Sequence, residues 1–543
     1  MRRAVGGLRP RARGFAAATK RVELFVYNLP YTSTESDIKA GFAPYCDVQH
    51  VRLTLDSQGK SRGFAFIVIE TGEVQVVRAE IDGLLFAGRR LGCKFAIGDN
   101  KATVLMSQQA AIDVNKDLVA SKSASDLLAL FDGKGSEFTA VNLATAVHRL
   151  GALVRNAPVD AADKPHLRRL LQRAAASISD DVASEQWAAR ALANAVVGLS
   201  RGNLGGDFKD EKKALYSAVA NAAPKKIETF NPQELANLVW AFSTAGFEAP
   251  ELFDSVAEAA PKRMEKFYAQ ELANVAWAFS TAGRTAPALF ESIASQVPLR
   301  IESFLPQHLA NLAWAFASAG FRAQSLFELL AATAESQIGK FEPFALPNLV
   351  WAFAKAGVEA PALFDAAEPA ISTNAQSLTS QALANAAWAY AKAGVPAPNM
   401  FQAVAAAAVR KMNSFSPQHL SISAWSYAKA GETAPELFKA IAEESVRTMD
   451  RFNAQALSNT AWAFAKAQVE APLLFQAVAL EGTKKVHMFN SQALGNIAWA
   501  FAMHRLDSPI LFEAVAGQTL EKLASFNAHE LNNIVWAYAT ASQ

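Results

Sequence analysis

The sequence predicts an α+β domain near the N-terminus, followed by an all-α solenoid of two-helix repeats. Strand-like and helix-like segments alternate over residues 22–97, which is the pattern of a small mixed domain. After them, a phrase built around tryptophan returns every 37 residues without an insertion. A strict period of this length is typical of stacked supersecondary units. The tryptophans stand at positions 240, 277, 314, 351, 388, 425, 462, 499 and 536.

Residues 1–21 precede both parts and contain seven basic residues and no acidic one. They have no apolar core, so we do not expect a secretory signal. An arginine-rich, acid-free and serine-free segment favours a mitochondrial transit peptide over a plastid one, which is usually rich in hydroxyl groups. The alternative is a basic arm that assists the adjacent domain in binding.

Residues 22–97 are expected to form elements in the order βαββαβ. The predicted strands cover 24–29, 48–55, 62–69 and 90–96, and the predicted helices cover 34–42 and 73–81. Because side chains alternate along a strand, Phe25, Phe64 and Phe66 share the open face of the sheet, and we add Tyr27 to the same site. Ile69 is expected to point to the core.

Two of these strands resemble the RNA-recognition motif. Residues 24–29 are similar to its RNP hexamer and residues 62–69 to its octamer, at the family's spacing. Ile69 departs from the aromatic residue that usually ends the octamer. The resemblance implies that RNA bases stack on the exposed rings, while Lys60 and Arg62 contact phosphates. The alternative is that a protein or a neighbouring helix covers the same aromatic side chains.

Residues 98–135 are predicted to be a linker that includes a short amphipathic helix at 123–131, which would cap the solenoid. The solenoid then runs over 136–543 and holds about eleven repeats. Two degenerate repeats occupy 136–223, with Trp187 in the position that Phe230 holds in the first regular repeat. Terminal repeats are expected to be atypical because they lack a neighbour on one side.

Each repeat is predicted to contain two helices. In the first regular repeat Asn231 is a good N-cap, Pro232 suits the first helical position, and Glu234 stands where a capping box closes. Gly246 is a stop signal for this leading helix, and a second helix is expected to begin at Pro250.

A helical wheel separates two faces of the leading helix. Leu235 and Phe242 fall on the core-facing side, whereas Trp240 and Asn237 fall on the opposite side. The leucine and the aromatic residue recur in all nine copies, and the asparagine in eight, with Ile422 as the exception. The positions four after and six before tryptophan vary between copies, so they are candidates for discriminating a ligand.

Two sets of polar residues are candidate RNA contacts in the solenoid. They are the repeated asparagines, beginning with Asn237, Asn274 and Asn311, and a lysine ladder of Lys355, Lys392, Lys429 and Lys466. Neighbouring helices pack about 8–10 Å apart, which suits roughly one nucleotide per repeat. Packing between repeats is the favoured role of the tryptophans, and a solvated surface is an equal alternative for the lysines. A second basic series, fourteen residues before tryptophan at 226, 263, 300, 411, 485 and 522, fits helix-dipole stabilisation and phosphate contact equally well.

The 37-residue period and the phrase Leu-Ala-Asn-x-x-Trp-Ala-Phe resemble heptatricopeptide-type and octotricopeptide-type repeats over residues 138–543. The resemblance implies a non-enzymatic organellar protein that stabilises, processes or helps to translate transcripts. Its expected partners are single-stranded RNA and proteins of an organellar RNA-processing or ribosomal complex. The rival is a protein-binding solenoid of the armadillo kind, in which only the N-terminal domain touches RNA. We expect no RAP domain, which is often associated with these families, among residues 1–543, and we expect the last leading helix to expose its core face.

Composition argues against several classes of function. Cys46 and Cys93 are the only cysteines, so we expect no disulfide framework and no cysteine metal site. No apolar run approaches the roughly 20 residues of a membrane span. We find no nucleophile–base spacing and no phosphate-binding loop, and therefore expect no enzyme, no cofactor and no metal. Residues 1–100 hold 15 basic and 10 acidic residues against a net charge of +2 for the whole chain, so charge favours nucleic acid only near the N-terminus.

Overall fold

The computed structural model describes residues 20–55, 61–71, 74–95, 111–156, 159–506 and 508–541. The chain divides into two compact units, Met1–Asp117 and Leu118–Gln543. Most of the predicted transit peptide and the predicted phosphate contact Lys60 lie outside the described residues. Within those residues, no helix is long and apolar enough to cross a membrane.

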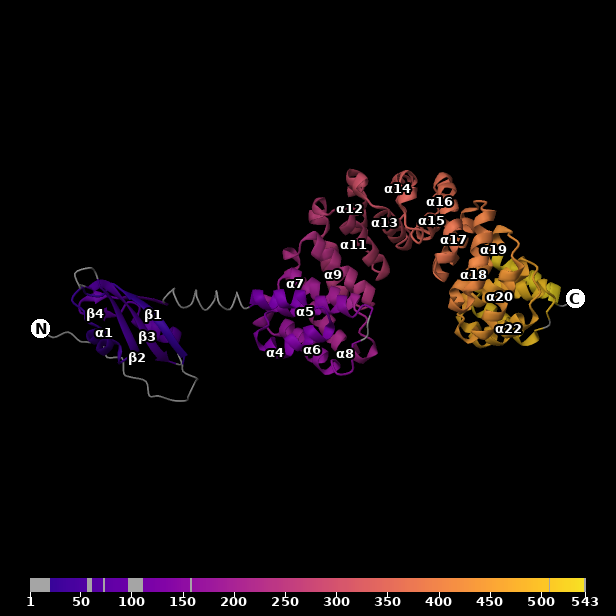
Figure 1. Ribbon diagram of the computed structural model, residues 1–543. Coiled ribbons are helices and arrows are strands. Elements are labelled where there is room, and N and C mark those ends of the chain that lie inside the picture. Colours follow the sequence, from indigo (N-terminus) through magenta and orange to yellow (C-terminus); the bar gives the residue numbers. More distant parts are fainter. Residues whose placement is uncertain are drawn as a thin grey trace. The chain divides into compact units, whose positions relative to one another are not determined.

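The first unit contains the predicted order of strands and helices. A four-stranded antiparallel sheet has the strand order β2-β3-β1-β6, with α1 and α2 in the two crossovers (Figure 1). The sequence prediction of an α+β domain is therefore confirmed. The elements are β1 (Lys20–Tyr27), α1 (Glu35–Phe42), β2 (Asp47–Leu55), β3 (Ser61–Thr71), α2 (Val74–Ile81), β4 (Leu85–Phe86), β5 (Arg89–Arg90) and β6 (Gly92–Phe95).

The last predicted strand is shorter than expected. It was expected over residues 90–96, whereas β6 covers only Gly92–Phe95 and Arg89–Arg90 pair with Leu85–Phe86 in a separate hairpin. The two turn residues, Ala87 and Gly88, have φ values of 44° and 83°. Positive φ at both turn positions matches the twist of a tight hairpin, so this segment folds back on itself before it joins the sheet.

One face of the sheet is covered by the two helices. Leu24, Val26, Ala65, Ile67 and Ile69 are fully buried in a core that also contains side chains of α1 and α2. The inward position of the residue that departs from the octamer pattern is thus confirmed. Because successive side chains alternate between faces, the intervening residues of β1 and β3 stay on the open side.

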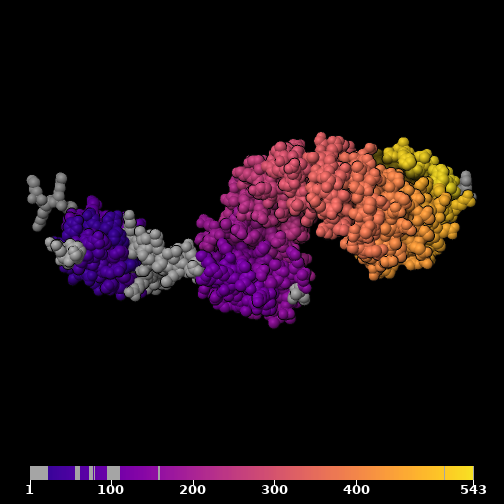
Figure 2. Space-filling view, turned by 45° about the horizontal axis from the view of Figure 1, so that its top comes forward, coloured from indigo at the N-terminus to yellow at the C-terminus, as the bar shows by residue number. Residues whose placement is uncertain are grey.

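The second unit is an array of paired helices, as the 37-residue period predicted. Figure 2 shows the repeats as one packed body in which the colours follow one another in sequence order. The leading helices of the described part are α5 (Ala140–Leu153), α7 (Ala189–Arg201), α9 (Pro232–Ala245), α11 (Ala269–Thr281), α13 (Pro306–Ser318), α15 (Leu346–Ala356), α17 (Ser380–Ala393), α19 (Pro417–Ala430), α21 (Ala454–Lys466), α23 (Ser491–Met503) and α25 (Ala528–Ala541).

A second helix follows each leading helix except α25 within the described residues. These helices are α6 (Lys164–Ser179), α8 (Lys209–Ala222), α10 (Pro250–Ala259), α12 (Pro287–Gln296), α14 (Gln324–Ser336), α16 (Pro361–Asn374), α18 (Pro398–Arg410), α20 (Pro435–Arg447), α22 (Pro472–Lys485) and α24 (Pro509–Glu521). A short 3-10 helix usually leads from each one into the next repeat, for example η4 (Pro224–Thr229) and η9 (Met412–Ser414). Before the array, residues 111–120 are helical and α4 (Ala124–Lys134) packs against α5 and α6.

The predicted end signals of the leading helix are present. In α9 the Asn231 side chain accepts a hydrogen bond from the Glu234 N–H, and the Glu234 carboxylate accepts one from the Asn231 N–H, both at 2.9 Å. Gly246 ends the helix in the left-handed conformation at φ 62°. Six repeats have a glycine with positive φ at this position. In two others Gln468 and Arg505 stand there and adopt the same left-handed conformation, with φ values of 56° and 49°.

Leading helices pack on leading helices and form the spine of the array. Over its middle, α13 and α15 lie on the inside of the curve, and α12, α14 and α16 lie on the outside (Figure 1). Leu235, Leu238 and Phe242 are completely buried, as the helical wheel predicted. In the last leading helix, the equivalent Leu531 and Tyr538 are only half-buried.

Candidate nucleic-acid interface

Four aromatic rings lie together on the open face of the sheet. β3 places Phe66 opposite Phe25 and Phe64 opposite Tyr27. The ring centroid of Phe25 lies 5.8 Å from that of Tyr27, 5.5 Å from that of Phe64 and 5.3 Å from that of Phe66. Tyr27 is exposed and the three phenylalanines are half-buried. The structure therefore gathers the predicted aromatic residues into one apolar platform that faces solvent.

Two arginines flank this platform. The predicted Arg62 lies over Phe64, with its guanidinium carbon 5.5 Å from the ring centroid. Arg52, which the sequence reasoning missed, lies 4.6 Å from the centroid of Phe66 and 3.4 Å from a carboxylate oxygen of Glu23. Its side chain is 62% exposed, so a phosphate can reach it. The register of β2 on β3 places Arg52 directly opposite Phe66, and that register could not be read from the sequence.

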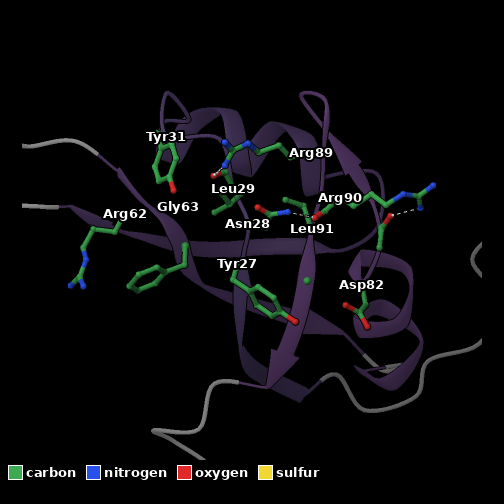
Figure 3. A pocket seen from close by; sticks show the side chains of 13 residues that line it. Tyr27, Asn28, Leu29, Tyr31, Arg62, Gly63, Asp82, Arg89, Arg90 and Leu91 are labelled. Carbon is green, nitrogen blue, oxygen red and sulfur yellow. Dashed lines mark hydrogen bonds between the residues drawn. The ribbon is translucent and has the colours of Figure 1, made fainter.

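A hollow of about 670 Å³ adjoins the platform at the end of β1. Figure 3 shows Tyr27, Tyr31 and the side chains of Arg62, Arg89 and Arg90 around it. The Arg89 guanidinium carbon lies 4.9 Å from the centroid of the Tyr31 ring. The guanidinium groups of Arg62 and Arg90 extend away on opposite sides of the hollow, whereas that of Arg89 lies beside Leu29 (Figure 3). Positive side chains thus border the hollow, where an anionic strand is favoured.

Backbone and side-chain contacts hold the hollow in shape. The Asn28 side chain donates a hydrogen bond to the Arg90 carbonyl at 2.8 Å, and the Asp82 carboxylate accepts one from the Cys93 N–H at 2.9 Å. Gly92 lies directly beneath the Tyr27 ring, where a Cβ atom would overlap it. Tyr27 can lie flat over β6 only because this glycine has no side chain.

The tryptophans of the repeats form a ladder whose indoles contact one another but are not completely buried. The indole centroids of Trp314 and its neighbours Trp277 and Trp351 are 6.3 and 6.4 Å apart, and Trp351 and Trp388 are 5.9 Å apart. Further steps of 6.4, 6.4 and 6.5 Å run from Trp425 through 462 and 499 to 536. The indoles from 277 onwards pack between repeats, as favoured, but each stays partly accessible because the side chains are half-buried or, at 536, exposed.

The repeated asparagines lie beside this ladder. Asn237, Asn274 and Asn311 are half-buried. Farther along the array the Asn385 side chain donates to the Asn348 side-chain oxygen at 3.1 Å, which ties two neighbouring repeats together. These amides therefore have a structural role available in addition to the predicted contact with RNA.

The lysine ladder is exposed on the leading helices. In the described parts of the chain no ion pair engages Lys355, Lys392, Lys429 or Lys466. Each lies in the last turn of its helix, where a cation also stabilises the helix dipole. Lys355 and Lys392 line a hollow of about 510 Å³ with Trp388, Ile422, Trp425, Gln455, Asn459 and Gln492. The other two lysines do not line it.

The second basic series joins each repeat to the one before it. Lys411 Nζ donates to the carbonyls of Gln376 at 2.6 Å and Leu378 at 2.8 Å. Lys485 and Lys522 each reach two carbonyls in the same way. Residues 226, 263 and 300 also donate to carbonyls of the preceding repeat. These cations stabilise the ends of the preceding 3-10 turns, so phosphate contact is not needed to explain them.

The residue six positions before tryptophan, which varies between copies, caps the leading helix in five of the repeats. Glu234, Glu271 and Glu530 accept a hydrogen bond from the N-cap N–H at 2.9–3.0 Å. His308 and His419 do the same through Nδ1 at 3.3 and 3.4 Å, and burial lowers the pKa of both imidazoles. These side chains are already engaged, which weakens the hypothesis that this position discriminates a ligand.

The repeats match a family description, RNA-editing substrate-binding complex 6 protein, at residues 204–336 and 261–542. Together these segments span more than half of the chain. The chain belongs to this family. The RNA-editing substrate-binding complex 6 match covers the regular repeats, including the tryptophan ladder and all four lysines. The heptatricopeptide or octotricopeptide type stays a prediction.

The N-terminal sheet matches the RNA recognition motif at residues 24–91, which confirms that resemblance. Over 70 residues it is 41% identical to a putative RNA-binding protein RbpD of Nostoc, covering 12% of this chain and 74% of the relative. It is also 40% identical over 70 residues to the multiple RNA-binding domain-containing protein 1 of Neurospora crassa, but spans only 8% of that relative and 13% of this chain. A solution structure of the N-terminal RNA binding domain of a hypothetical protein is 35% identical, with 15% of this chain and 86% of that one covered and a TM-score of 0.14.

Metal ligands and cysteine thiols were the candidate reactive groups of this family member. No group of three or more His, Cys, Asp or Glu side chains that could hold a metal ion occurs among them. Burial raises the pKa of the Cys46 thiol to about 11 and that of the Cys93 thiol to about 12. A thiol with a raised pKa is a poor nucleophile at neutral pH.

Proposed function

We propose that the chain is a non-enzymatic RNA-binding protein of an organelle that acts in transcript stabilisation, processing or translation. The observation that carries the proposal is the platform of four aromatic rings flanked by Arg52 and Arg62 on an open sheet. Base–aromatic stacking is worth about 1–3 kcal/mol per base and accepts any sequence. The sheet therefore supplies general affinity for single-stranded RNA, while arginines beside it contact phosphates.

The repeats add a second RNA contact in this proposal. Half-buried indoles, amides and the lysine ladder occupy one side of the leading helices. The family's description names an RNA-editing substrate-binding complex, and we propose an RNA-processing assembly of this kind as the protein partner. Mitochondrial location is part of the proposal, with the plastid as the alternative, and import of a fluorescent protein fused to residues 1–21 tests it.

A protein-binding scaffold is the second candidate for the repeats. It is favoured by the cross-repeat bond between Asn385 and Asn348 and by the contacts among the indoles, since both give the predicted ladders a packing role. Only the sheet would then touch RNA. Full-length protein with an intact sheet but altered repeat lysines separates the two candidates, because a scaffold would keep its RNA affinity.

The experiment that tests the proposal removes two rings of the platform. Phe64→Ala with Phe66→Ala in the full chain should weaken binding of a labelled single-stranded RNA by about 2–6 kcal/mol, the stacking of two bases. Val68→Ala, a change to a half-buried aliphatic residue on the same strand and face, is the matched control and should leave the affinity unchanged. Fluorescence anisotropy gives both values. Retained affinity in the double variant would indicate a sheet that faces protein.

A further inference from the structure

The hollow on the leading helices draws on five consecutive repeats. Lys355 comes from α15, Lys392 from α17 and Ile422 from α19. Trp388 and Trp425 also line it, and α21 and α23 contribute the amides of Gln455, Asn459 and Gln492. Its volume of about 510 Å³ falls within the range of roughly 300–1,000 Å³ typical of ligand sites.

The indole ladder is interrupted at this hollow. Trp388 contacts Trp351 at 5.9 Å, and Trp425 contacts Trp462 at 6.4 Å. Across the part of the chain that the structure describes, no ring contact joins Trp388 to Trp425. The two indoles therefore line the same hollow without stacking on each other.

The repeated asparagine is missing at the same place. Ile422 stands where the other eight regular copies have asparagine. An aliphatic side chain cannot extend the amide-to-amide contact that Asn385 makes with Asn348. Among the described residues Trp240 and Trp277 also lack a ring contact, but a missing indole contact and a missing asparagine coincide at the hollow.

The chemistry of the lining selects a planar, anionic ligand. Two lysines without an ion pair among the described residues supply positive charge, and no carboxylate lines the hollow. Indole faces favour a flat ring system, and side-chain amides offer both donors and acceptors to its edge. A nucleotide combines these properties, whereas an acidic peptide lacks the planar ring.

We propose that this hollow binds one unstacked nucleobase of single-stranded RNA between Trp388 and Trp425. Lys355 and Lys392 contact the adjacent phosphates, and the amides of Gln455, Asn459 and Gln492 face the edge of the base. The proposal rests on RNA binding by the whole protein and assigns it one specific base site in the repeats.

The test compares two pairs of lysines in the full-length protein. Lys355→Gln with Lys392→Gln should weaken binding of a labelled single-stranded RNA and lower the magnitude of its salt slope by about 1.4, or about 0.7 per lost phosphate contact. Lys340→Gln with Lys439→Gln is the matched control, because these two lysines are exposed on the array but belong neither to the lysine ladder nor to the hollow. Equal effects of the two pairs, or no effect of the first, would overturn the proposal.

A second variant fills the hollow without removing an aromatic side chain. Ile422→Phe places a larger side chain where Ile422 lines the hollow, and it should cost the affinity of one stacked base, about 5- to 150-fold. Photocrosslinking of RNA that contains 4-thiouridine should label a peptide with Trp388 or Trp425 in the native protein and lose that label in Ile422→Phe. A label confined to the N-terminal sheet would reject the site.

The variant that lacks Phe64 and Phe66 is measured in parallel. If its affinity falls while the hollow variants bind normally, the base site is wrong and the general RNA-binding function stands. If the native protein does not bind RNA at all, the proposed function fails and the base site fails with it. If an acidic peptide binds to the hollow and RNA does not, the hollow belongs to a protein partner.

Discussion

Lys411→Met isolates the contribution of one cation that joins neighbouring repeats. Lys411 Nζ donates to the carbonyls of Gln376 at 2.6 Å and Leu378 at 2.8 Å, and its side chain is half-buried. Hydrogen bonds to charged groups contribute about 1.5–3 kcal/mol, but the contact with Gln376 is exposed and is worth less. We therefore expect the free energy of unfolding to fall by about 1–3 kcal/mol. Methionine keeps most of the apolar stem, so packing changes little.

Lys429→Met is the matched control, because Lys429 is exposed and has no ion pair within the described residues. Its free energy of unfolding should change by less than about 0.5 kcal/mol. Urea unfolding followed by circular dichroism gives both values, and hydrogen exchange at residues 375–378 reports the loss locally. Equal stability losses in the two variants would refute the structural role of the cross-repeat cation. Under native conditions Lys411→Met should leave the salt slope of RNA binding unchanged.

Three further predictions follow from single positions. Gln468→Gly and Arg505→Gly should each raise the free energy of unfolding by about 1 kcal/mol, because both residues occupy the left-handed region. An unchanged or lower melting temperature would contradict this. His308→Gln with His419→Gln should make the melting temperature less sensitive to acid. Burial lowers the pKa of both imidazoles, so the unfolded chain binds more protons than the folded chain in acid. The stability contribution of the two histidines is therefore complete above about pH 6.5 and is lost as the pH falls below that value. Glutamine keeps the capping bond, and His148, whose pKa is also lowered by burial, leaves some acid sensitivity in the variant; an undiminished difference between pH 5 and pH 8 would count against this role. Gly92→Ala should weaken RNA binding, since its Cβ would displace the Tyr27 ring. Gly83→Ala has open space around it and strain from a φ of 85°, so it controls for lost stability without displacing that ring.

Periodicity was enough to predict the architecture of both units. Alternation along residues 24–29 and 62–69 predicted the open face of the sheet, because side-chain direction on a strand depends only on position. Asn231, Glu234 and Gly246 predicted the helix ends, since their signals act within a few residues of the chain.

Contacts between elements were not predictable in the same way. Arg52 reaches Phe66 through a strand register that includes irregularities near residues 48–50 and 53–55, and no local pattern encodes it. Arg89 and Arg90 border the hollow because a tight turn at residues 87–88 forms a separate hairpin. Ile422 was visible as an exception in the sequence, but only the stacked repeats show that it lines a hollow with two indoles that do not contact each other.

The cross-repeat cations join some junctions of the array and are missing from others. At the equivalent position, Asn374 donates to the Ala370 carbonyl and Thr448 to the Glu444 carbonyl, each within its own helix at 2.8 Å. Neither of these side-chain bonds reaches the preceding repeat. The two residues belong to the repeats on either side of the one that has Lys411. Mechanical compliance should concentrate at these two junctions, so that a pulling force or a long bound strand would change the curvature of the array there before it disturbs the more firmly joined repeats.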